Sequence, residues 1–293
     1  MSEVLIPKDA ATIMLVRDVP GSAHGGATTE MQVLMLRRNA RSTWVGGAYL
    51  FPGGAVDPED RGDEMARHCR GRDDAEASRL LGIESGGRGY FVAAVRECFE
   101  EAGVLLAAPP SLGDGPLSFE DPYTAARFVN HRRRLNTGET TLAAICQEEG
   151  IHIDLDRLAY FSHWITPEGA PRRYDTRFFV GIVPAGQEAL PDDKEVVATT
   201  WIEPNEAVRR HLAGELDVMF PTMKNLEAIG RFSFSADLMA AAAAAEVPTI
   251  LPRVNVEDEG ARIVLPGDDQ YESASGLPKG VDFPDRPQPT KRL

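Results

Sequence analysis

The sequence predicts an α/β fold with helical insertions, and three observations support this prediction. Short runs rich in Leu and β-branched residues recur along the chain and are typical of strands. One run without Gly or Pro in its interior, residues 90–102 (YFVAAVRECFEEA), repeats small apolar residues every four positions, which is a helical period. Two further segments, residues 57–89 and 108–150, are polar and lack this strand pattern. We expect them to be additions to the central sheet.

The strands are expected as short segments in chain order. The first two are connected by a stretch rich in Gly, Pro, Ser and His, and the third runs into a tight turn at Pro52-Gly53-Gly54. The expected strands are residues 11–17, 32–37, 48–51, 104–107, 160–165, 176–183, 196–202 and 262–265.

The helices are expected between these strands and toward the end of the chain. Gly103 follows the 90–102 helix directly and is a natural C-terminal stop. A run of alanines, residues 240–245, has high helix propensity and predicts a packed helix. The expected helices are residues 74–81, 90–102, 204–213, 222–229 and 236–246.

The length and the charge of the chain limit its organisation and its partners. At about 150 residues per domain, 293 residues fit two domains or one enlarged domain. We expect a single domain over residues 1–271 and a flexible tail over residues 272–293. The 31 basic and 45 acidic side chains leave a net charge of −14, which argues against nucleic-acid and anionic-membrane partners. A small anionic substrate remains possible, because a bound cation reverses the charge locally.

Cysteine content and hydropathy indicate the compartment. Cys69, Cys98 and Cys146 do not form a disulfide framework, so we expect a reducing compartment, the cytoplasm. The longest weakly polar run, residues 238–245, is far shorter than the roughly 20 residues that span a bilayer. For the oligomeric state there is only the general frequency of homodimers among soluble proteins.

The chemistry is concentrated in one acidic cluster on the 90–102 helix. Glu97, Glu100 and Glu101 stand at positions i, i+3 and i+4, so their side chains project from one face within one turn. Three like charges this close repel one another, and a divalent cation relieves the repulsion. Carboxylate oxygens favour Mg²⁺ or Mn²⁺, which share their coordination sphere with substrate phosphates. A solvated acidic face is the simpler reading of the triplet alone. Arg96 stands four residues before Glu100 and can brace that carboxylate.

The segment from Arg96 to Val104, RECFEEAGV, resembles the second half of the nudix box. The pattern of that box is Gly, five residues, Glu, seven residues, then Arg-Glu-apolar-any-Glu-Glu-any-Gly-apolar. Every defined position of the second half is met, but counting back eight residues from Arg96 reaches Arg88 rather than Glu. We place the opening of the box at Pro52-Gly53-Gly54, with residues 57–89 splitting the motif. The resemblance implies an α/β/α sandwich with a mixed sheet over roughly residues 10–265.

A split box of this kind is similar to the nudix hydrolase 19-type branch, whose animal members are coenzyme A diphosphatases. The stretches His163–Pro167, Asp175–Phe179 and Phe220–Thr222 support this branch. Residues 47–54 (GAYLFPGG) match the end of a coenzyme A signature, and Arg38 falls on its first Arg. The second Arg of the signature falls on Thr43, and Arg41 is two residues away from it.

The resemblance implies metal-assisted hydrolysis of a nucleoside diphosphate linked to another group. The metal, Mg²⁺ or Mn²⁺, would be held by Glu97, Glu100 and Glu101, with Arg96 beside them in the site. Nudix enzymes often recruit a further acidic residue from outside the box. Asp192, Asp193 and Glu195 are the candidates for metal contact or general base, and we prefer Glu195. Substrate contacts are expected from the residues of the signature and from one nearby cation, namely Arg38, Arg41, Gly53, Gly54 and Arg177.

Three functions remain open from the sequence. The first is a diphosphatase for coenzyme A or acyl-coenzyme A. The second is the same chemistry on ADP-ribose, NADH or a dinucleotide, which the incomplete coenzyme A signature keeps possible. The third is a non-catalytic nucleotide-binding module, which the missing first Glu of the box favours and the intact carboxylate triplet disfavours.

Overall fold

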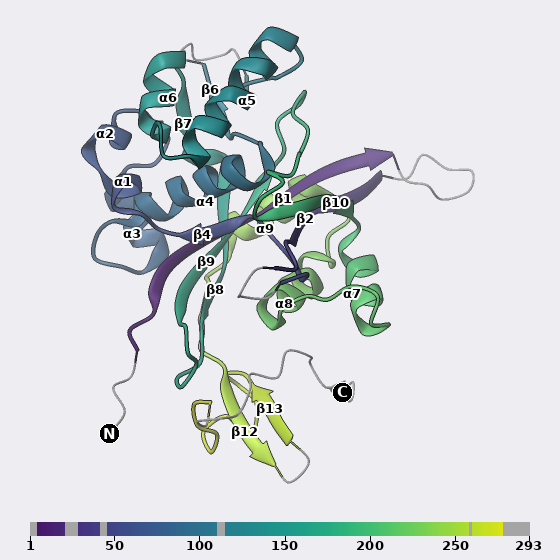
Figure 1. Cartoon of the computed structure of the whole chain (residues 1–293). Helices are drawn as coiled ribbons and strands as arrows, with labels where there is room; N and C mark the ends of the chain where they lie inside the picture. The colour runs from purple at the N-terminus through teal and green to yellow at the C-terminus, as the bar shows by residue number, and fades with distance from the viewer. Residues whose placement is uncertain (1–4, 21–28, 42–45, 110–114, 258–259, 278–293) are drawn as a thin grey trace.

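The computed structural model describes residues 5–20, 29–41, 46–109, 115–257 and 260–277, and a mixed β-sheet forms its centre (Figure 1). The strand order is β10-β2-β1-β9-β8-β11, with β3 paired to β2 and β4 paired to β1. β1 runs parallel to β9, and β11 parallel to β8, whereas the other pairs are antiparallel. The strands of this sheet are β1 (Lys8–Pro20), β2 (Thr29–Arg38), β3 (Tyr49–Leu50), β4 (Gly53–Ala55), β8 (Leu158–Ile165), β9 (Tyr174–Ile182), β10 (Val196–Ile202) and β11 (Thr249–Ile250).

Both faces of the sheet are covered by apolar packing. Successive side chains of a strand point to opposite faces, so neighbouring residues of one strand report on the two sides. On β1, Ile13 and Leu15 belong to one apolar cluster, and Met14 and Val16 belong to another. The two clusters therefore lie on opposite faces of the sheet and need helices on both sides. This arrangement confirms the α/β fold with a mixed sheet that the sequence predicted.

The helices form the two outer layers (Figure 1). α4 packs into the first cluster and α8 and α9 into the second, as Phe91, Leu226 and Leu238 show. α1 and α3 contact α4 directly. The helices are α1 (Pro58–Arg61), α2 (Asp63–Ala66), α3 (Asp74–Leu81), α4 (Gly87–Ala102), α5 (Pro122–Asn136), α6 (Leu142–Glu149), α7 (Pro204–Leu212), α8 (Phe220–Ile229) and α9 (Ser235–Ala244).

The two polar segments stay outside the central sheet, as the sequence predicted. Residues 57–89 fold into α1, α2 and α3, and residues 108–150 contain α5 and α6. β5 of the first segment pairs with β7, which follows the second segment, and β7 also pairs with β6 at the start of that segment. The result is a separate small sheet of order β5-β7-β6, formed by β5 (Cys69–Arg70), β6 (Ala107–Ala108) and β7 (His152–Asp154). A 3₁₀ turn, Leu155–Arg157, then leads into β8.

The last described residues form a hairpin apart from the sheet, β12 (Arg253–Glu257) and β13 (Gly260–Val264) (Figure 1). Ser275 exchanges backbone hydrogen bonds with Val254, and the Leu277 amide donates to the Glu168 carbonyl. The chain thus remains attached several residues beyond position 271, where we placed the start of the tail. Residues 278–293 lie outside the described part. Within the described part, no helix has the length and hydrophobicity needed to cross a membrane.

Two local predictions differ from the structure. The tight turn expected at Pro52-Gly53-Gly54 is instead the entry to β4, because Gly53 and Gly54 pair with Thr12 and Ala11 of β1. The strand expected at residues 104–107 is reduced to β6. Most of the stretch expected to connect β1 and β2 lies outside the described residues.

Candidate active site

Helix α4 presents the acidic cluster to the opening of the box. Gly86 and Gly103 bound the helix in the left-handed region, with φ of 81° and 73°, and the Gly103 amide donates to the Phe99 carbonyl. The first half of α4 is apolar and anchored on the sheet, where the rings of Phe91 and Phe179 are 4.5 Å apart. The second half carries charged side chains into a nearly buried position.

Arg96 is the centre of this charged half. Its Nε and Nη2 donate to the two carboxylate oxygens of Asp60, both at 2.9 Å, and Nη2 also donates to the Ala55 carbonyl at 2.8 Å. Its Nη1 donates to Glu97 at 2.8 Å and to Glu100 at 3.1 Å. All five guanidinium N–H groups are therefore used. The prediction that Arg96 braces Glu100 is confirmed, and the same side chain also fixes Glu97.

Asp60 is a site residue that the sequence analysis missed. It is 2% exposed and forms the bidentate pair with Arg96 from helix α1, inside the 57–89 insertion. It lies six residues after Gly54, which is the spacing between the Gly and the first Glu of the nudix box. This spacing was the signal available in the sequence. The box therefore keeps its first carboxylate as an aspartate, and the extra residues that split the motif follow Asp60 instead of starting at residue 57.

Gly53 and Gly54 bring the β4 backbone against two of the carboxylates. The Gly53 amide donates to Glu101 Oε2 at 3.0 Å. A Cβ added at Gly54 would lie 2.4 Å from Glu97 Oε1, and one added at Gly53 would lie 2.5 Å from Thr12 Oγ1. Neither position tolerates a side chain without movement. The two glycines thus bring the backbone close to the acidic cluster.

Burial raises the pKa of all three glutamates. The pKa of Glu97 rises to about 7, chiefly from burial, while the neighbouring Arg96 opposes the shift. The pKa of Glu100 is raised for the same reason. The pKa of Glu101 is raised well above its usual range by burial and by the charge of Glu97. Buried carboxylates held this close favour either a proton or a cation.

Glu195 reaches this site from the loop before β10. It forms an ion pair with Arg38 at the end of β2, and both residues act electrostatically on Glu101. Asp192 has a different role, because its Oδ1 accepts the backbone amides of Lys194, Glu195 and Val196. Of the three candidates in this loop, Asp192 is therefore used in shaping the backbone, and Glu195 is the one that acts electrostatically on Glu101.

Arg41 and Arg177 are placed differently from Arg38. Arg41 is exposed in a turn, and its backbone amide donates to the Asn39 side chain. Arg177 is 3% exposed, donates to Asp175 at 2.5 Å and lies 4.4 Å over the Tyr90 ring. Within the described residues, neither guanidinium forms an ion pair or a hydrogen bond with the glutamates of α4.

The donor set suits a hard divalent cation. The groups are carboxylate oxygens, with no thiol or imidazole among them, and such oxygens are the ligands of Mg²⁺ and Mn²⁺. Their burial and raised pKa show an unbalanced negative charge that a cation would neutralise. Among the described residues no three candidate ligands already converge. Mg²⁺ usually binds one or two carboxylates and completes its sphere with water and phosphate, so full convergence is not required.

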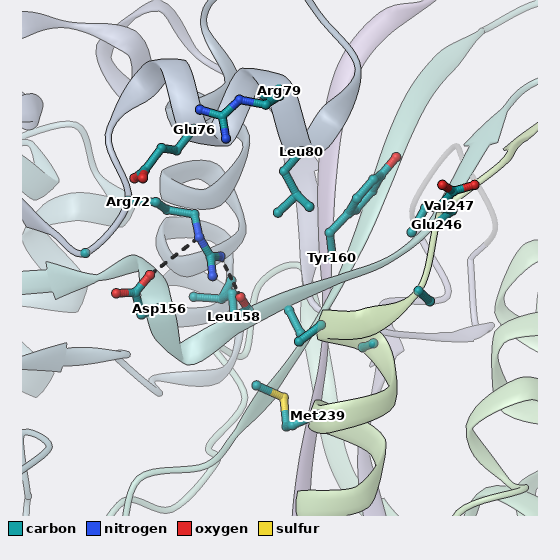
Figure 2. Close-up of a pocket in the computed structure, with 15 residues that line it drawn as sticks. Arg72, Glu76, Arg79, Leu80, Asp156, Leu158, Tyr160, Met239, Glu246 and Val247 are labelled. Carbon is teal, nitrogen blue, oxygen red and sulfur yellow. Dashed lines mark hydrogen bonds and ion pairs between the residues drawn. The ribbon is translucent and has the colours of Figure 1, made fainter.

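A sizeable cleft lies away from this site. A cleft of about 840 Å³ lies between α3, the start of β8 and the end of α9, and Figure 2 shows its lining. Arg72 forms an ion pair with Asp156 there, donates to the Leu158 carbonyl and lies 5.1 Å over the Phe91 ring. Phe91 is six residues before Glu97, roughly 9 Å along the helix axis. None of the site residues predicted from the sequence lines the cleft.

A buried Arg-Glu-x-x-Glu-Glu-x-Gly helix on a mixed sheet, facing a Gly-Gly strand, defines the fold and site of a Nudix hydrolase. The family model described as the NUDT19 Nudix domain matches residues 86–229, from the start of α4 to the end of α8. The chain is 30% identical to the acyl-coenzyme A diphosphatase NUDT19 of Gallus gallus, over 90% of this chain and 79% of that protein. It is 29% identical to the acyl-coenzyme A diphosphatase NUDT19 of Homo sapiens, over 82% and 72%.

A solved structure agrees with this match. The crystal structure of a Nudix hydrolase from Alicyclobacillus acidocaldarius superposes with a TM-score of 0.65 and 26% sequence identity, covering 82% of this chain and 98% of that one. The chain belongs to the NUDT19 branch of the Nudix hydrolase family.

Proposed function

We propose that this protein hydrolyses the diphosphate bond of coenzyme A or acyl-coenzyme A in the presence of Mg²⁺ or Mn²⁺. Water would attack one phosphorus and release 3′,5′-ADP and the 4′-phosphopantetheine or its acyl derivative. The observation that carries the proposal is the complete box, in which Asp60 holds Arg96 and Arg96 holds Glu97 and Glu100. The likeness to the acyl-coenzyme A diphosphatases of two vertebrates supports the substrate.

The carboxylates would hold the metal, and the protein would fix their positions. Glu97, Glu100 and Glu101 are the proposed ligands, because burial and mutual repulsion raise their pKa values and a cation relieves both costs. A bound divalent cation supplies charge neutralisation on the diphosphate oxygens and a lower pKa for the attacking water. The buried Arg96–Asp60 pair keeps two of the glutamates in place before substrate arrives.

Glu195 and Arg38 are proposed to act together at the rim. Glu195 is the carboxylate from outside the box that we assign to metal contact or general base. Arg38 now balances Glu195, and its guanidinium can donate to a substrate phosphate instead. Substrate binding would thus exchange one partner of Arg38 for another and free Glu195 to accept a proton from water. Arg41, exposed in its turn, remains a further candidate for a phosphate contact.

Product analysis tests the function directly. The parent chain is incubated with Mg²⁺ and coenzyme A, acetyl-coenzyme A, ADP-ribose, NADH or a diadenosine polyphosphate, and the products are separated. We expect 3′,5′-ADP from the first two substrates, and its formation by the Glu101→Gln variant to be slower by about 10³-fold. Cleavage of the other substrates alone would overturn the coenzyme A assignment and keep the Nudix chemistry. The lack of Arg at position 43 makes this comparison necessary.

The proposed setting is a reducing one, in the cytoplasm. Cys69, Cys98 and Cys146 are free. Burial raises the pKa of the Cys69 thiol to about 11 and that of Cys146 to about 12, which keeps both thiols protonated at neutral pH. The cysteines are therefore not assigned a catalytic role.

A further inference from the structure

The C-terminal end of helix α4 is held by side chains from α5, within the 108–150 segment. A helix leaves its last carbonyl groups without partners of its own. The Glu100 carbonyl accepts Arg132 Nε at 2.9 Å and Asn136 Nδ2 at 3.1 Å. The Ala102 carbonyl accepts the Leu190 amide at 2.9 Å. The turn that carries two of the proposed metal ligands is therefore fixed from outside the helix.

Arg132 also reaches the loop that carries Glu195. Its Nη1 donates to the Pro191 carbonyl at 3.4 Å, and Asp192 and Asp193 act on its charge. That loop is ordered from within by Asp192 and tied to β2 by the hydrogen bond from the Asn39 amide to the Glu195 carbonyl. The guanidinium of Arg132 thus bridges helix α4, which carries three of the acidic residues, and the loop that carries Glu195.

The guanidinium of Arg132 is held in this bridge at a cost in desolvation. Burial lowers the pKa of Arg132, against the pull of the surrounding acidic groups. Its Nη2 and the Asn136 Oδ1 are buried without a hydrogen-bond partner. Packing that does not involve Arg132 holds α5 in place. Phe128 is 2% exposed, and the centroid of its ring lies 6.4 Å from that of Phe99 in an edge-on arrangement.

We infer that Arg132 is a positioning residue for the metal site: it sets the separation between the carboxylates of α4 and Glu195. This inference rests on the proposed function only for the identity of the metal ligands. The carbonyl of Glu100 and the carbonyl of Pro191 are the two contacts through which Arg132 acts. A cation at this helix end also balances the negative end of the helix dipole.

Binding of Mn²⁺ to the substrate-free chain, followed by electron paramagnetic resonance, tests the inference without any turnover. Arg132→Ala should weaken Mn²⁺ binding roughly tenfold, the size expected for the loss of a group that orients ligands. Asn136→Ala, which removes the second donor to Glu100, should weaken it less. Arg133→Ala is the matched control, because Arg133 is exposed on the same helix and pairs with Glu139. It should bind Mn²⁺ like the parent.

A double-mutant cycle separates positioning from general stability. If Arg132 acts by setting the place of Glu195, its removal should matter much less in a Glu195→Gln background, where the negative charge of that carboxylate is already lost. Arg132→Lys keeps the charge and a single donor, and it should recover part of the affinity if Arg132→Ala folds poorly. Independent effects of Arg132→Ala and Glu195→Gln, or parent-like Mn²⁺ binding by Arg132→Ala, would overturn the inference.

The two proposals fail in different ways. Loss of the coenzyme A assignment would appear as cleavage of another substrate, with the dependence of Mn²⁺ binding on Arg132 unchanged. If the positioning role is wrong, the parent chain still cleaves coenzyme A, but the effects of Arg132→Ala and Glu195→Gln on Mn²⁺ binding are additive.

Discussion

The two halves of helix α4 border very different regions. Beside the first half lies the cleft of Figure 2, which has a volume of about 840 Å³ and is lined by alanines, aliphatic side chains and one partly exposed ion pair. Beside the second half, four acidic groups and one guanidinium are packed together with little exposure. Buried charge, which folding tolerates only at a cost, marks the chemistry better than volume does.

If the chemistry lies in the acidic cluster and not in the cleft, Glu101→Gln should cause the largest loss of activity. The amide oxygen of Gln can still accept the Gly53 amide, so the fold should persist while the charge is lost. We expect kcat/KM to fall by about 10³-fold, within the range of a lost acid–base or metal-binding group. Steady-state kinetics and a thermal melt in parallel check this. Activity within a few-fold of the parent would place the chemistry elsewhere.

Asp60→Asn should damage stability as well as activity. Asp60 is buried and gives both oxygens to Arg96, so the substitution leaves a buried guanidinium short of one compensating charge. Breaking a buried pair from one side costs about 3 kcal/mol. Urea unfolding measures it. The control is Asp63→Asn, at an exposed position of α2. Equal stability of the two variants would contradict the role given to Asp60.

Glu97 should make the stability of the metal-free protein depend on pH. Its pKa is about 7 in the folded chain, above the value of 4.5 for a free glutamate, so the folded state holds the proton more tightly. Stability should therefore fall as the pH rises from about 4.5 to 7, by at most about 3 kcal/mol. Added Mg²⁺ should reduce this fall by stabilising the anion. Unfolding curves across this range, with Glu97→Gln for comparison, are the measurement.

Metal binding should show the opposite trend with pH. Because the metal competes with the proton on Glu97, Mn²⁺ affinity should increase as the pH rises through about 7 and then level off. Affinity that is flat between about pH 6 and pH 8 would show that Glu97 is not a ligand.

The smallest effect is expected in the cleft. Arg79 lines it from α3 and is exposed. Arg79→Gln should change stability by less than about 0.5 kcal/mol, as most surface substitutions do, and should leave kcat/KM unchanged. A tenfold loss of activity on coenzyme A would mean that the cleft, and not only the acidic cluster, takes part in substrate binding.

Much of the site was predictable because it is local in sequence. The spacing of Glu97, Glu100 and Glu101 puts them on one helical face, and Arg96 was expected to brace one of them. The resemblance also placed the opening of the box at Gly53 and Gly54, although these residues begin a strand rather than form a turn. The period of a helix places the glutamates on one face, and glycine lacks a Cβ. Both properties can be read from a short segment of sequence.

The chain by itself determined the carboxylate helix, the layered α/β fold and the family. Tertiary structure decided which distant groups complete the site. Asp60 reaches Arg96 because α1 packs on α4. Arg132 reaches the Glu100 carbonyl because α5 also packs on α4. It also decided that Arg177 lies against Tyr90, while Arg38 faces Glu195. Residue types and spacing specify local geometry, whereas the partners of a long charged side chain depend on which elements pack beside it.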